Sequence, residues 1–493
     1  MRQIQTHQIS NWPKLAWVAR IMPTSQPIEV YHGPMVEIAK TWCVEAVWAG
    51  DFEKADFDKT DLIFGTGIKL LDDGVVFVNS GTTTDRLWYS TRDGIHYVSN
   101  TLPGLLAISD DSLLENRNYW LDIRTICRGL EYYARTIPAT LGDIGVVYFD
   151  NLFYDGTKLL TIDKPDRTPC FRHYEEYYSF LCQTAQKIGK NARSPERCHK
   201  VLPLGTISTG YDACATAVIA RYAGCRKVVT MRQSSSLWRG SDSGENIASH
   251  LGLQCKVYNT KTKHYAYEAA FWAASGRAFL LNWAQLDYPE PLCLFFTGCR
   301  GDAVWNYGTD KIPDPFSVPS VGDLGIAEFR LIRGLFHCPV PFWGIRRIAD
   351  LRTISVSSDM RPWSLVGDYN RPIARRIIEE AGVPRNVFAQ RKKNTALSSY
   401  FLWPYSPDAI TSFRRYIKSR GLLAPPTWII HILKAVSNVD MLFYLNVTGK
   451  LGLVHGDVGL RRLISLKANN LLFHWGNWEL KRMYAEALHD STN

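Results

Sequence analysis

A turn of small residues followed by an aspartate is the clearest indication of chemistry in this chain. Ser208, Thr209 and Gly210 follow an apolar run, and Tyr211 and Asp212 open a stretch of helix-forming composition. The N–H groups at the start of a helix suit a phosphate or pyrophosphate. A carboxylate at the same place can hold the Mg²⁺ that accompanies a nucleotide. The segment therefore predicts a phosphate-binding turn, although an ordinary strand-turn-helix unit contains the same kinds of residue.

A second aspartate follows another apolar run. Residues 292–296 (LCLFF) are apolar, and residues 297–302 (TGCRGD) come directly after them and end at Asp302. In open sheets of parallel strands, ligands bind beyond the carboxyl ends of the strands. We therefore expect Asp212 and Asp302 on the same rim of one sheet. A plain turn carboxylate is the alternative for Asp302.

Strand and helix signals alternate around these two aspartates. We expect strands at residues 201–207, 227–231, 253–258, 279–281 and 292–296, and helices at 212–222 and 242–251. The second helix has an N-cap pattern, with Asp242 followed three residues later by Glu245, and it ends before Gly252. Such alternation predicts an α/β domain with a parallel sheet and helices on its faces.

The first part of the chain has a different pattern. Short β-prone runs punctuated by glycine occupy about residues 45–107, and Asp93 and Gly94 stand between two of them. Asp-Gly between strand-like runs predicts a hairpin. We therefore expect an antiparallel, layered domain here, with a helical stretch near residues 116–134.

The composition is that of a globular protein. The 493 residues predict two domains, and 46% of them are hydrophobic and 21% charged. No apolar run is long enough to span a membrane, and the first residues lack the apolar core of a signal peptide, so we expect a cytoplasmic protein without a membrane partner. The 11 cysteines include no CxxC pair and indicate neither a zinc site nor a disulfide framework.

The formal net charge of +10 leaves three interpretations open. Much of the excess lies between residues 330 and 393. It could serve a nucleic acid, a triphosphate or carboxylate ligand, or only a solvated basic face.

Several segments resemble the ATP pyrophosphatase superfamily in order and spacing. Residues 208–213 (STGYDA) resemble its SGGxDS pyrophosphate loop, and residues 297–305 (TGCRGDAVW) resemble the TGxGxDE segment of the asparagine synthetase branch. Residues 391–393 (RKK) resemble that branch's RxK segment, and residues 85–107 resemble the end of its glutaminase-like domain. The order is similar to that of asparagine synthetase, β-lactam synthetase and lasso-peptide cyclases.

The resemblance implies a fold and a division into domains. Residues 1–165 would form a degenerate glutaminase-like domain of the Ntn-hydrolase type, with αββα layers. Residues 170–400 would form an ATP pyrophosphatase domain with a HUP-like parallel sheet, after a proline-bearing linker at residues 163–169. Residues 401–493 would be a helical extension that helps to shape the pocket of the acceptor.

The resemblance also implies roles for single residues. The turn of Ser208, Thr209, Gly210, Tyr211 and Asp212 would bind the pyrophosphate of ATP, mainly through backbone N–H groups. Met231 would lie against the adenine, Arg391 beside the phosphates, and Mg²⁺ between Asp212 and Asp302. Lys393 would stabilise charge during catalysis. An ordinary surface lysine at this position, or a functional Lys392 in its place, is the alternative.

Two departures from the family pattern bear on function. Thr209 stands at the usual second glycine and Ala213 at the usual closing serine, which removes one hydroxyl donor from the anion site. A glutaminase of this type uses an N-terminal cysteine whose own amine is the base, but residue 2 is Arg2 and the nearest cysteine, Cys43, is internal. We therefore expect no glutamine hydrolysis, and a nitrogen source that is free ammonia or an amine of the substrate.

The resulting prediction is an ATP-dependent ligase that adenylates a small-molecule carboxylate, releases pyrophosphate and transfers the acyl group to an amine or ammonia. A catalytically weak or inactive nucleotide-binding scaffold is the second possibility. A tRNA-modifying enzyme is the third, but nucleic acid is an unlikely partner because the paired reactive cysteines of thiolating members are missing. A homodimer is possible.

Overall fold

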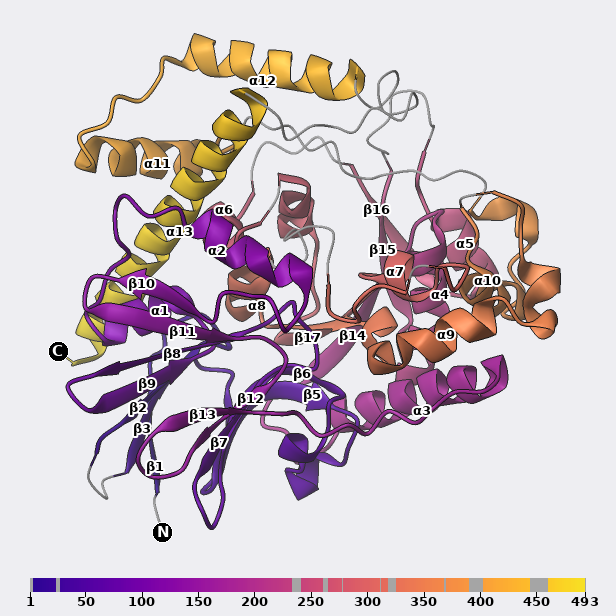
Figure 1. The fold of residues 1–493 in the computed structure, drawn as a ribbon, viewed down its shortest axis with the longest axis horizontal. Coiled ribbons are helices and arrows are strands. Elements are labelled where there is room, and N and C mark those ends of the chain that lie inside the picture. Colours follow the sequence, from indigo (N-terminus) through magenta and orange to yellow (C-terminus); the bar gives the residue numbers. More distant parts are fainter. Residues whose placement is uncertain are drawn as a thin grey trace.

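The computed structural model describes residues 3–23, 27–232, 241–259, 265–276, 278–310, 312–317, 325–367, 369–389, 402–443 and 460–492. These residues form a mixed α/β structure with two mostly antiparallel sheets and one parallel sheet (Figure 1). None of the helices in these ranges combines the length and the apolar character that a membrane span needs.

The first sheet has seven strands. In spatial order they are β1 (Ile4–Gln8), β3 (Ile28–His32), β2 (Trp17–Ile21), β9 (Ile95–Ser99), β8 (Leu87–Arg92), β11 (Gly142–Val147) and β10 (Thr136–Ala139). Only β1 and β3 pair in parallel. The predicted hairpin is confirmed, because Asp93 and Gly94 join β8 to β9 with φ angles of 49° and 77°. Two positive φ angles match the twist of the paired strands, which favours such two-residue turns.

The second sheet has six strands and faces the first. In spatial order they are β13 (Leu159–Ile162), β12 (Asn151–Tyr154), β7 (Val75–Val78), β6 (Ile63–Leu70), β5 (Trp42–Trp48) and β4 (Glu37–Ile38). One apolar core lies between the sheets, with Trp17 and Val98 from the first and Ile68 and Phe77 from the second. Alternation along each strand produces it, since every second side chain points the same way.

The outer faces of this pair of sheets are covered unequally. Helices α1 (Leu102–Ile108) and α2 (Tyr119–Ile123) pack on the first sheet. The second sheet packs against two 3₁₀ turns at Phe52–Lys54 and Phe57–Lys59. The layered arrangement expected from the sequence is thus found, with a helical layer on one side and short turns on the other. The helix expected near residues 116–134 is limited to α2 and a 3₁₀ turn at Arg124–Arg128.

The parallel sheet lies in the second half of the chain. Its spatial order is β16 (Gln254–Tyr258), β15 (Lys227–Met231), β14 (Val201–Thr206), β17 (Leu292–Thr297) and β18 (Leu335–Pro339), and every pair is parallel. The chain moves outward from β14 on one side and then returns to continue from β14 on the other side. The order therefore reverses between β14 and β17, which is where ligands bind in such sheets.

Helices cover this sheet and connect its strands. They are α3 (Tyr174–Ala192), α4 (Tyr211–Ala220), α5 (Glu245–His250), α6 (Glu268–Ala273), α7 (Gly301–Val304), α8 (Ala327–Arg333), α9 (Ile348–Ser355) and α10 (Pro372–Glu380). Helix α4 packs on β14 and β17, and α10 packs on α4. The apolar faces of α3 and α4 join the largest core of the described chain.

One prediction for this half is wrong, and one strand is missed. Residues 279–281 belong to a 3₁₀ helix at Ala278–Gln285 and not to a strand. So short an apolar run cannot distinguish strand from helix by its periodicity. Strand β18 is not predicted at all, because it follows helix α8 after a single residue, Gly334, whose φ of +78° ends the helix.

Three helices follow at the end of the chain: α11 (Pro407–Ser419), α12 (Thr427–Phe443) and α13 (Leu460–Thr492). Helix α13 packs against α1 of the first half and α6 of the second (Figure 1). Gly476 meets the backbone of α6, where a Cβ would come within 2.4 Å of the nitrogen of Ala273. Phe473 packs with Tyr119 of α2. The predicted helical extension therefore contacts both halves.

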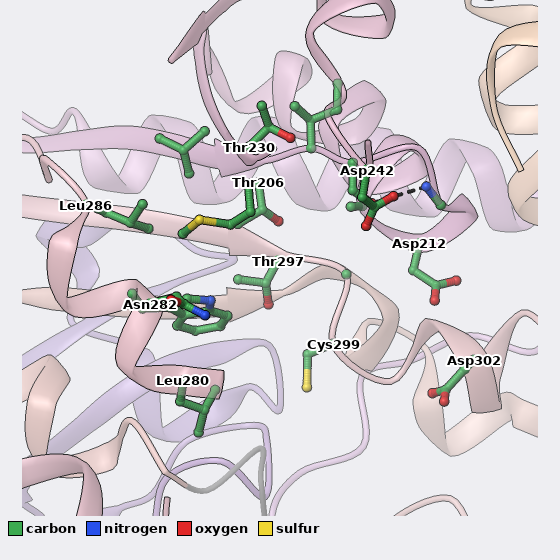
Figure 2. Close-up of a pocket in the computed structure, with 18 of the residues that line it drawn as sticks. Thr206, Asp212, Thr230, Asp242, Leu280, Asn282, Leu286, Thr297, Cys299 and Asp302 are labelled. Carbon is green, nitrogen blue, oxygen red and sulfur yellow. Dashed lines mark hydrogen bonds between the residues drawn. The ribbon is translucent and has the colours of Figure 1, made fainter. Parts of the chain in front are cut away.

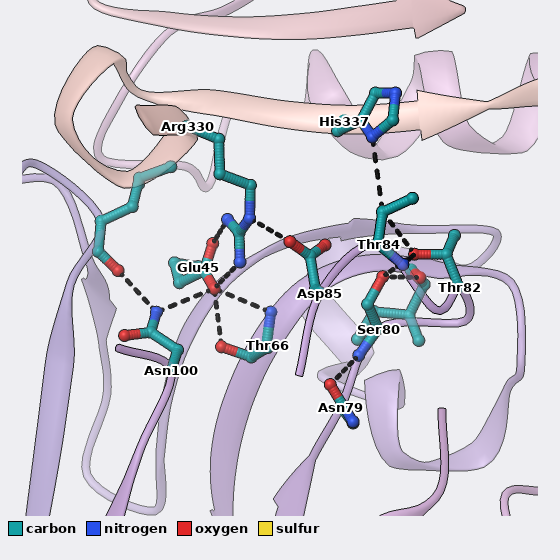
Figure 3. A network of polar contacts seen from close by, with 12 residues as sticks. Glu45, Thr66, Asn79, Ser80, Thr82, Thr84, Asp85, Asn100, Arg330 and His337 are labelled. Carbon is teal, nitrogen blue, oxygen red and sulfur yellow. Dashed lines mark hydrogen bonds and ion pairs between the residues drawn. The ribbon is translucent and has the colours of Figure 1, made fainter. Parts of the chain in front are cut away.

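A buried polar cluster also joins the halves (Figure 3). The guanidinium of Arg330, on α8, donates to both oxygens of Glu45 on β5, at 2.7 and 3.0 Å, and its Nε donates to Asp85. Nearby, Thr101 Oγ1 donates to Glu328 Oε2 at 2.7 Å. We call these five residues the seam cluster. All five are at most 5% exposed, so a ligand cannot reach them and their role is structural.

Candidate active site

A cavity of about 360 Å³ opens at the carboxyl ends of β14, β15 and β17 (Figure 2). It lies where the strand order reverses, as expected for a ligand site. The carboxylates of Asp212, Asp242 and Asp302 lie towards one end, and Leu280 and Leu286 lie with Asn282 towards the other. The lining includes Thr206, Ser208, Asp212, Met231, Asp242, Leu280, Asn282, Trp283, Leu286, Thr297, Cys299, Asp302, His337, Tyr369 and Arg371.

The turn after β14 is held by its own side chains and by a neighbouring carboxylate. The hydroxyl of Ser208 accepts the N–H of Gly210 at 3.1 Å. The carboxylate of Asp242 accepts the N–H of Thr209 at 3.3 Å and also its hydroxyl. The prediction that Asp242 caps the following helix is wrong: α5 begins after Gly244 without a side-chain cap. Asp242 instead occupies donors of the turn that could serve an anionic ligand.

Helix α4 begins where the sequence predicts, with Gly210 as its N-cap and no side chain capping it. Tyr211 is fully buried, its hydroxyl contacts Arg375, and its ring packs on Phe388 at 5.9 Å between centroids. Of the predicted pyrophosphate-binding residues, Tyr211 is therefore the one whose side chain lies in the core. Only its backbone N–H can face a ligand.

Asp212 forms an ion pair that the sequence does not predict. Nη1 of Arg371 contacts both carboxylate oxygens of Asp212, and we call this contact the rim pair. Burial would lower the pKa of the Arg371 guanidinium, but the neighbouring Asp212 carboxylate outweighs this effect and raises it. Arg371 therefore stays charged and neutralises the aspartate at the mouth of α4.

Asp302 lies on the same rim. It is in the first turn of α7, its side chain is exposed, and it adds to the charge effect on Arg371. Gly301 allows the start of α7 to lie close to Asp212, because a Cβ at this position would come within 2.5 Å of Cγ of Asp212. The structure thus brings Asp212, Asp302 and Arg371 together. Within the described ranges, no group of three or more His, Cys, Asp or Glu side chains is arranged to hold a metal ion.

The remaining predicted residues fall in two groups. Met231 ends β15 and lines the cavity, with Nε2 of Gln285 at 3.9 Å from its sulfur. Lys393 and Arg391 lie outside the described residues. Ala213 lines the cavity, so the hydroxyl that it lacks would have been at the site.

The sequence does not predict four of the lining residues, namely Arg371, Trp283, His337 and Tyr369. It also assigns Asp242 the wrong role. It groups Arg371 only with a basic region. The one available signal is Pro372, since proline favours the first helical position and so places Arg371 at the start of α10. His337 and Trp283 lie on the strand and the 3₁₀ helix that the sequence does not reveal.

Comparison of the chain with protein-family models and with curated proteins finds no match.

Proposed function

We propose that this protein is an ATP-dependent carbon–nitrogen ligase of the ATP pyrophosphatase type. A carboxylate substrate would attack the α-phosphorus of ATP and release pyrophosphate, and an amine or ammonia would then displace AMP from the acyl-adenylate. The observation that carries the proposal is the presence of Asp212 and Asp302 beside the start of α4, on the rim of a cavity at the carboxyl edge of a parallel sheet. We further propose that this sheet is HUP-like and that the facing sheets are a degenerate Ntn-type domain.

The donor set at the rim fits Mg²⁺ bound together with phosphates better than a resident metal. Magnesium in nucleotide sites is usually held by one or two carboxylates, with substrate phosphates and water as its other ligands. Asp302 is exposed and lines the same cavity as Asp212, so both would serve once Arg371 moves from the carboxylate. Bound there, Mg²⁺ would supply charge neutralisation for the leaving pyrophosphate.

Arg371 has two uses in this proposal. In the absence of nucleotide it neutralises Asp212. With a triphosphate present, its fork of donors suits phosphate oxygens as well as a carboxylate. The guanidinium would then bind phosphate while Asp212 turns to the metal.

The nitrogen source is proposed to be ammonia or an amine, without glutamine hydrolysis. Cys43 lies inside β5 and is 2% exposed. Burial raises the pKa of its thiol to about 12, so little thiolate is present at neutral pH. This thiol has neither the exposure nor the ionisation of a nucleophile.

A second function, a nucleotide-binding scaffold without turnover, is favoured by two contacts. Arg371 occupies both oxygens of Asp212, and Asp242 occupies the N–H and hydroxyl of Thr209. If neither contact opens, the turn and the aspartate are unavailable to pyrophosphate and metal.

Calorimetry with MgATP and a pyrophosphate-release screen over carboxylates and amines separate the two functions. A ligase binds MgATP and forms AMP and pyrophosphate with the right pair of substrates. We expect Asp302→Asn to slow release about tenfold or more, because a contact to a charged group contributes about 1.5–3 kcal/mol. The exposed Asp310→Asn, outside the cavity, is the matched control and keeps the wild-type rate.

Binding of MgATP without AMP under every substrate pair establishes the scaffold instead. If Asp302→Asn and Asp212→Asn both retain full turnover, the site is assigned wrongly. Absence of MgATP binding rejects both functions.

A further inference from the structure

The floor of the cavity contains a threonine whose hydroxyl is hydrogen-bonded to a buried histidine. His337, on β18, lines the cavity and lies next to Thr297 at the end of β17. Its Nε2 is 2.8 Å from Thr297 Oγ1, and its Nδ1 is 3.4 Å from Thr84 Oγ1. Figure 2 places Thr297 in the middle of the pocket, and Figure 3 places His337 directly over Thr84. His337 thus links the cavity to the two facing sheets.

A row of buried hydroxyls continues from Thr84. Its Oγ1 is 2.8 Å from Thr82 Oγ1, which is 3.2 Å from Ser80 Oγ. The row ends where Ser80 Oγ lies 3.3 Å from the carbonyl oxygen of Ile63. All three hydroxyl residues are at most 1% exposed, so water does not compete for these bonds.

The carbonyl at the end of the row gives every bond a direction. A carbonyl oxygen only accepts, so the hydroxyl of Ser80 donates its single proton to the carbonyl of Ile63. Thr82 must then donate to Ser80, and Thr84 to Thr82. Thr84 is left to accept, and the group that donates to it is Nδ1–H of His337.

The histidine passes this direction on to the cavity. Burial lowers the pKa of His337 to about 4, so at neutral pH the ring carries one proton. With that proton on Nδ1, Nε2 has a lone pair and accepts the hydroxyl proton of Thr297. The oxygen of Thr297 then has only lone pairs left for a ligand.

The opposite direction makes one hydrogen bond fewer. If the ring proton were on Nε2, each hydroxyl would turn towards His337, and Ser80 would no longer donate to Ile63. The carbonyl of Ile63 would keep the N–H of Gly81, at 2.6 Å, but lose the hydroxyl of Ser80. In a site closed to bulk solvent, the fully bonded direction is preferred.

We propose that Thr297 is a one-way hydrogen-bond acceptor in the floor of the cavity, oriented through His337, and that this subsite selects a ligand N–H or O–H group. His337 and Thr84 act as positioning residues. A phosphate or carboxylate oxygen is disfavoured there, because it would face lone pairs. Phosphates therefore belong at the rim beside Arg371. The identity of the ligand as an adenine nucleotide rests on the proposed function, but the orientation of Thr297 does not.

Nitrogen NMR of ¹⁵N-histidine-labelled protein tests the orientation without any ligand. The His337 signals, assigned by their loss in His337→Gln, should show the proton on Nδ1 in the wild type. Thr84→Val removes the acceptor for that proton, so the proton should move to Nε2. Thr83→Val, at a buried neighbour outside the row, is the matched control and should leave Nδ1 protonated. A proton on Nε2, or on both nitrogens, in the wild type overturns the proposal.

Calorimetry tests the selection with ATP and three analogues that each lack one donor: 2′-deoxyATP, 3′-deoxyATP and ITP. At least one analogue should bind about tenfold or more weakly than ATP, since a site built for a donor rejects a ligand without it. In Thr297→Val the dissociation constant of that analogue divided by that of ATP should approach one, whereas Thr297→Ser should keep the wild-type ratio. Because both constants are measured on the same variant, their ratio does not depend on the fraction of the protein that is folded.

The outcomes separate this proposal from the proposed function. If all analogues bind like ATP, or if the discrimination survives in Thr297→Val, the selection is wrong even though nucleotide binding stands. If ATP does not bind, the proposed function fails, and the histidine tautomer alone decides the orientation of Thr297.

Discussion

Two arginines of this protein bind carboxylates in very different surroundings. Arg330 in the seam cluster holds Glu45 and Asp85, and none of the three side chains is more than 2% exposed. Arg371 in the rim pair holds Asp212, whose side chain is 24% exposed. Both arginines are buried, since the side chain of Arg371 is only 6% exposed, but the carboxylate is closed to water at one place and open to it at the other.

The difference separates a structural ion pair from one that can be exchanged. A buried charge that loses its partner has no water to replace it, so breaking such a pair is strongly destabilising. An aspartate that already touches solvent can take water or a metal ion instead. The seam cluster therefore holds the two halves together, whereas the carboxylate of the rim pair remains in contact with solvent.

Removing the seam arginine should have the largest effect. Arg330→Met leaves Glu45 and Asp85 buried beside each other without a cation, and we expect a loss of about 3–5 kcal/mol in the free energy of unfolding. Urea titration followed by tryptophan fluorescence measures it. Arg333→Met is the matched control on the same helix, because Arg333 is 28% exposed and its partner Glu290 is 3.8 Å away. A loss in Arg330→Met no larger than in the control would contradict the structural role.

The pH dependence of stability should reveal the protonation of a second seam residue. Burial raises the pKa of Glu328 from 4.5 to about 7. Between these pH values the unfolded chain has released this proton and the folded chain still binds it, so stability falls as pH rises. At about 1.4 kcal/mol per pH unit, the loss is about 3 kcal/mol across the window and is complete above pH 7.

Glu328→Gln should remove this loss. The unfolding free energy of the variant, measured in urea from pH 4 to pH 8, should decline less steeply than that of the wild type. Glu131→Gln, at an exposed position, is the control and should follow the wild-type curve. Parallel curves for wild type and Glu328→Gln would mean that Glu328 is ionised in the folded protein.

The strands that are predicted correctly carry their own signal. Residues 292–296 are entirely apolar, as a strand buried on both faces must be, and β17 has six buried residues. The hairpin at Asp93 and Gly94 is likewise fixed locally, by turn chemistry. By contrast, the 3₁₀ helix at Ala278–Gln285 and strand β18 depend on packing by distant segments, which short apolar runs do not encode.

The candidate site divides in the same way. The turn at Ser208 and the aspartates at 212 and 302 are readable because each follows an apolar strand. The rim pair is not, since its partners are 159 residues apart and only the folded chain brings them together. The sequence predicts that Asp242 caps the helix that follows it. In the folded chain its carboxylate instead accepts the N–H and the hydroxyl of Thr209, which lies far from it in the sequence.

Removing the rim arginine should have the smallest effect on stability. Arg371→Met leaves Asp212 partly hydrated, and we expect the free energy of unfolding to fall by only about 1 kcal/mol. Arg385→Met is the matched control, because Arg385 is half exposed, pairs with Glu379 and lies outside the cavity. Without the guanidinium, the carboxylates of Asp212 and Asp302 repel each other and attract a cation, so MgCl₂ should raise the unfolding free energy of Arg371→Met more than that of the wild type or of Arg385→Met. Urea titrations with and without MgCl₂ measure both quantities. A loss as large as that of Arg330→Met, with no gain from Mg²⁺, would make the rim pair a second structural cluster and remove the opening on which nucleotide chemistry at Asp212 depends.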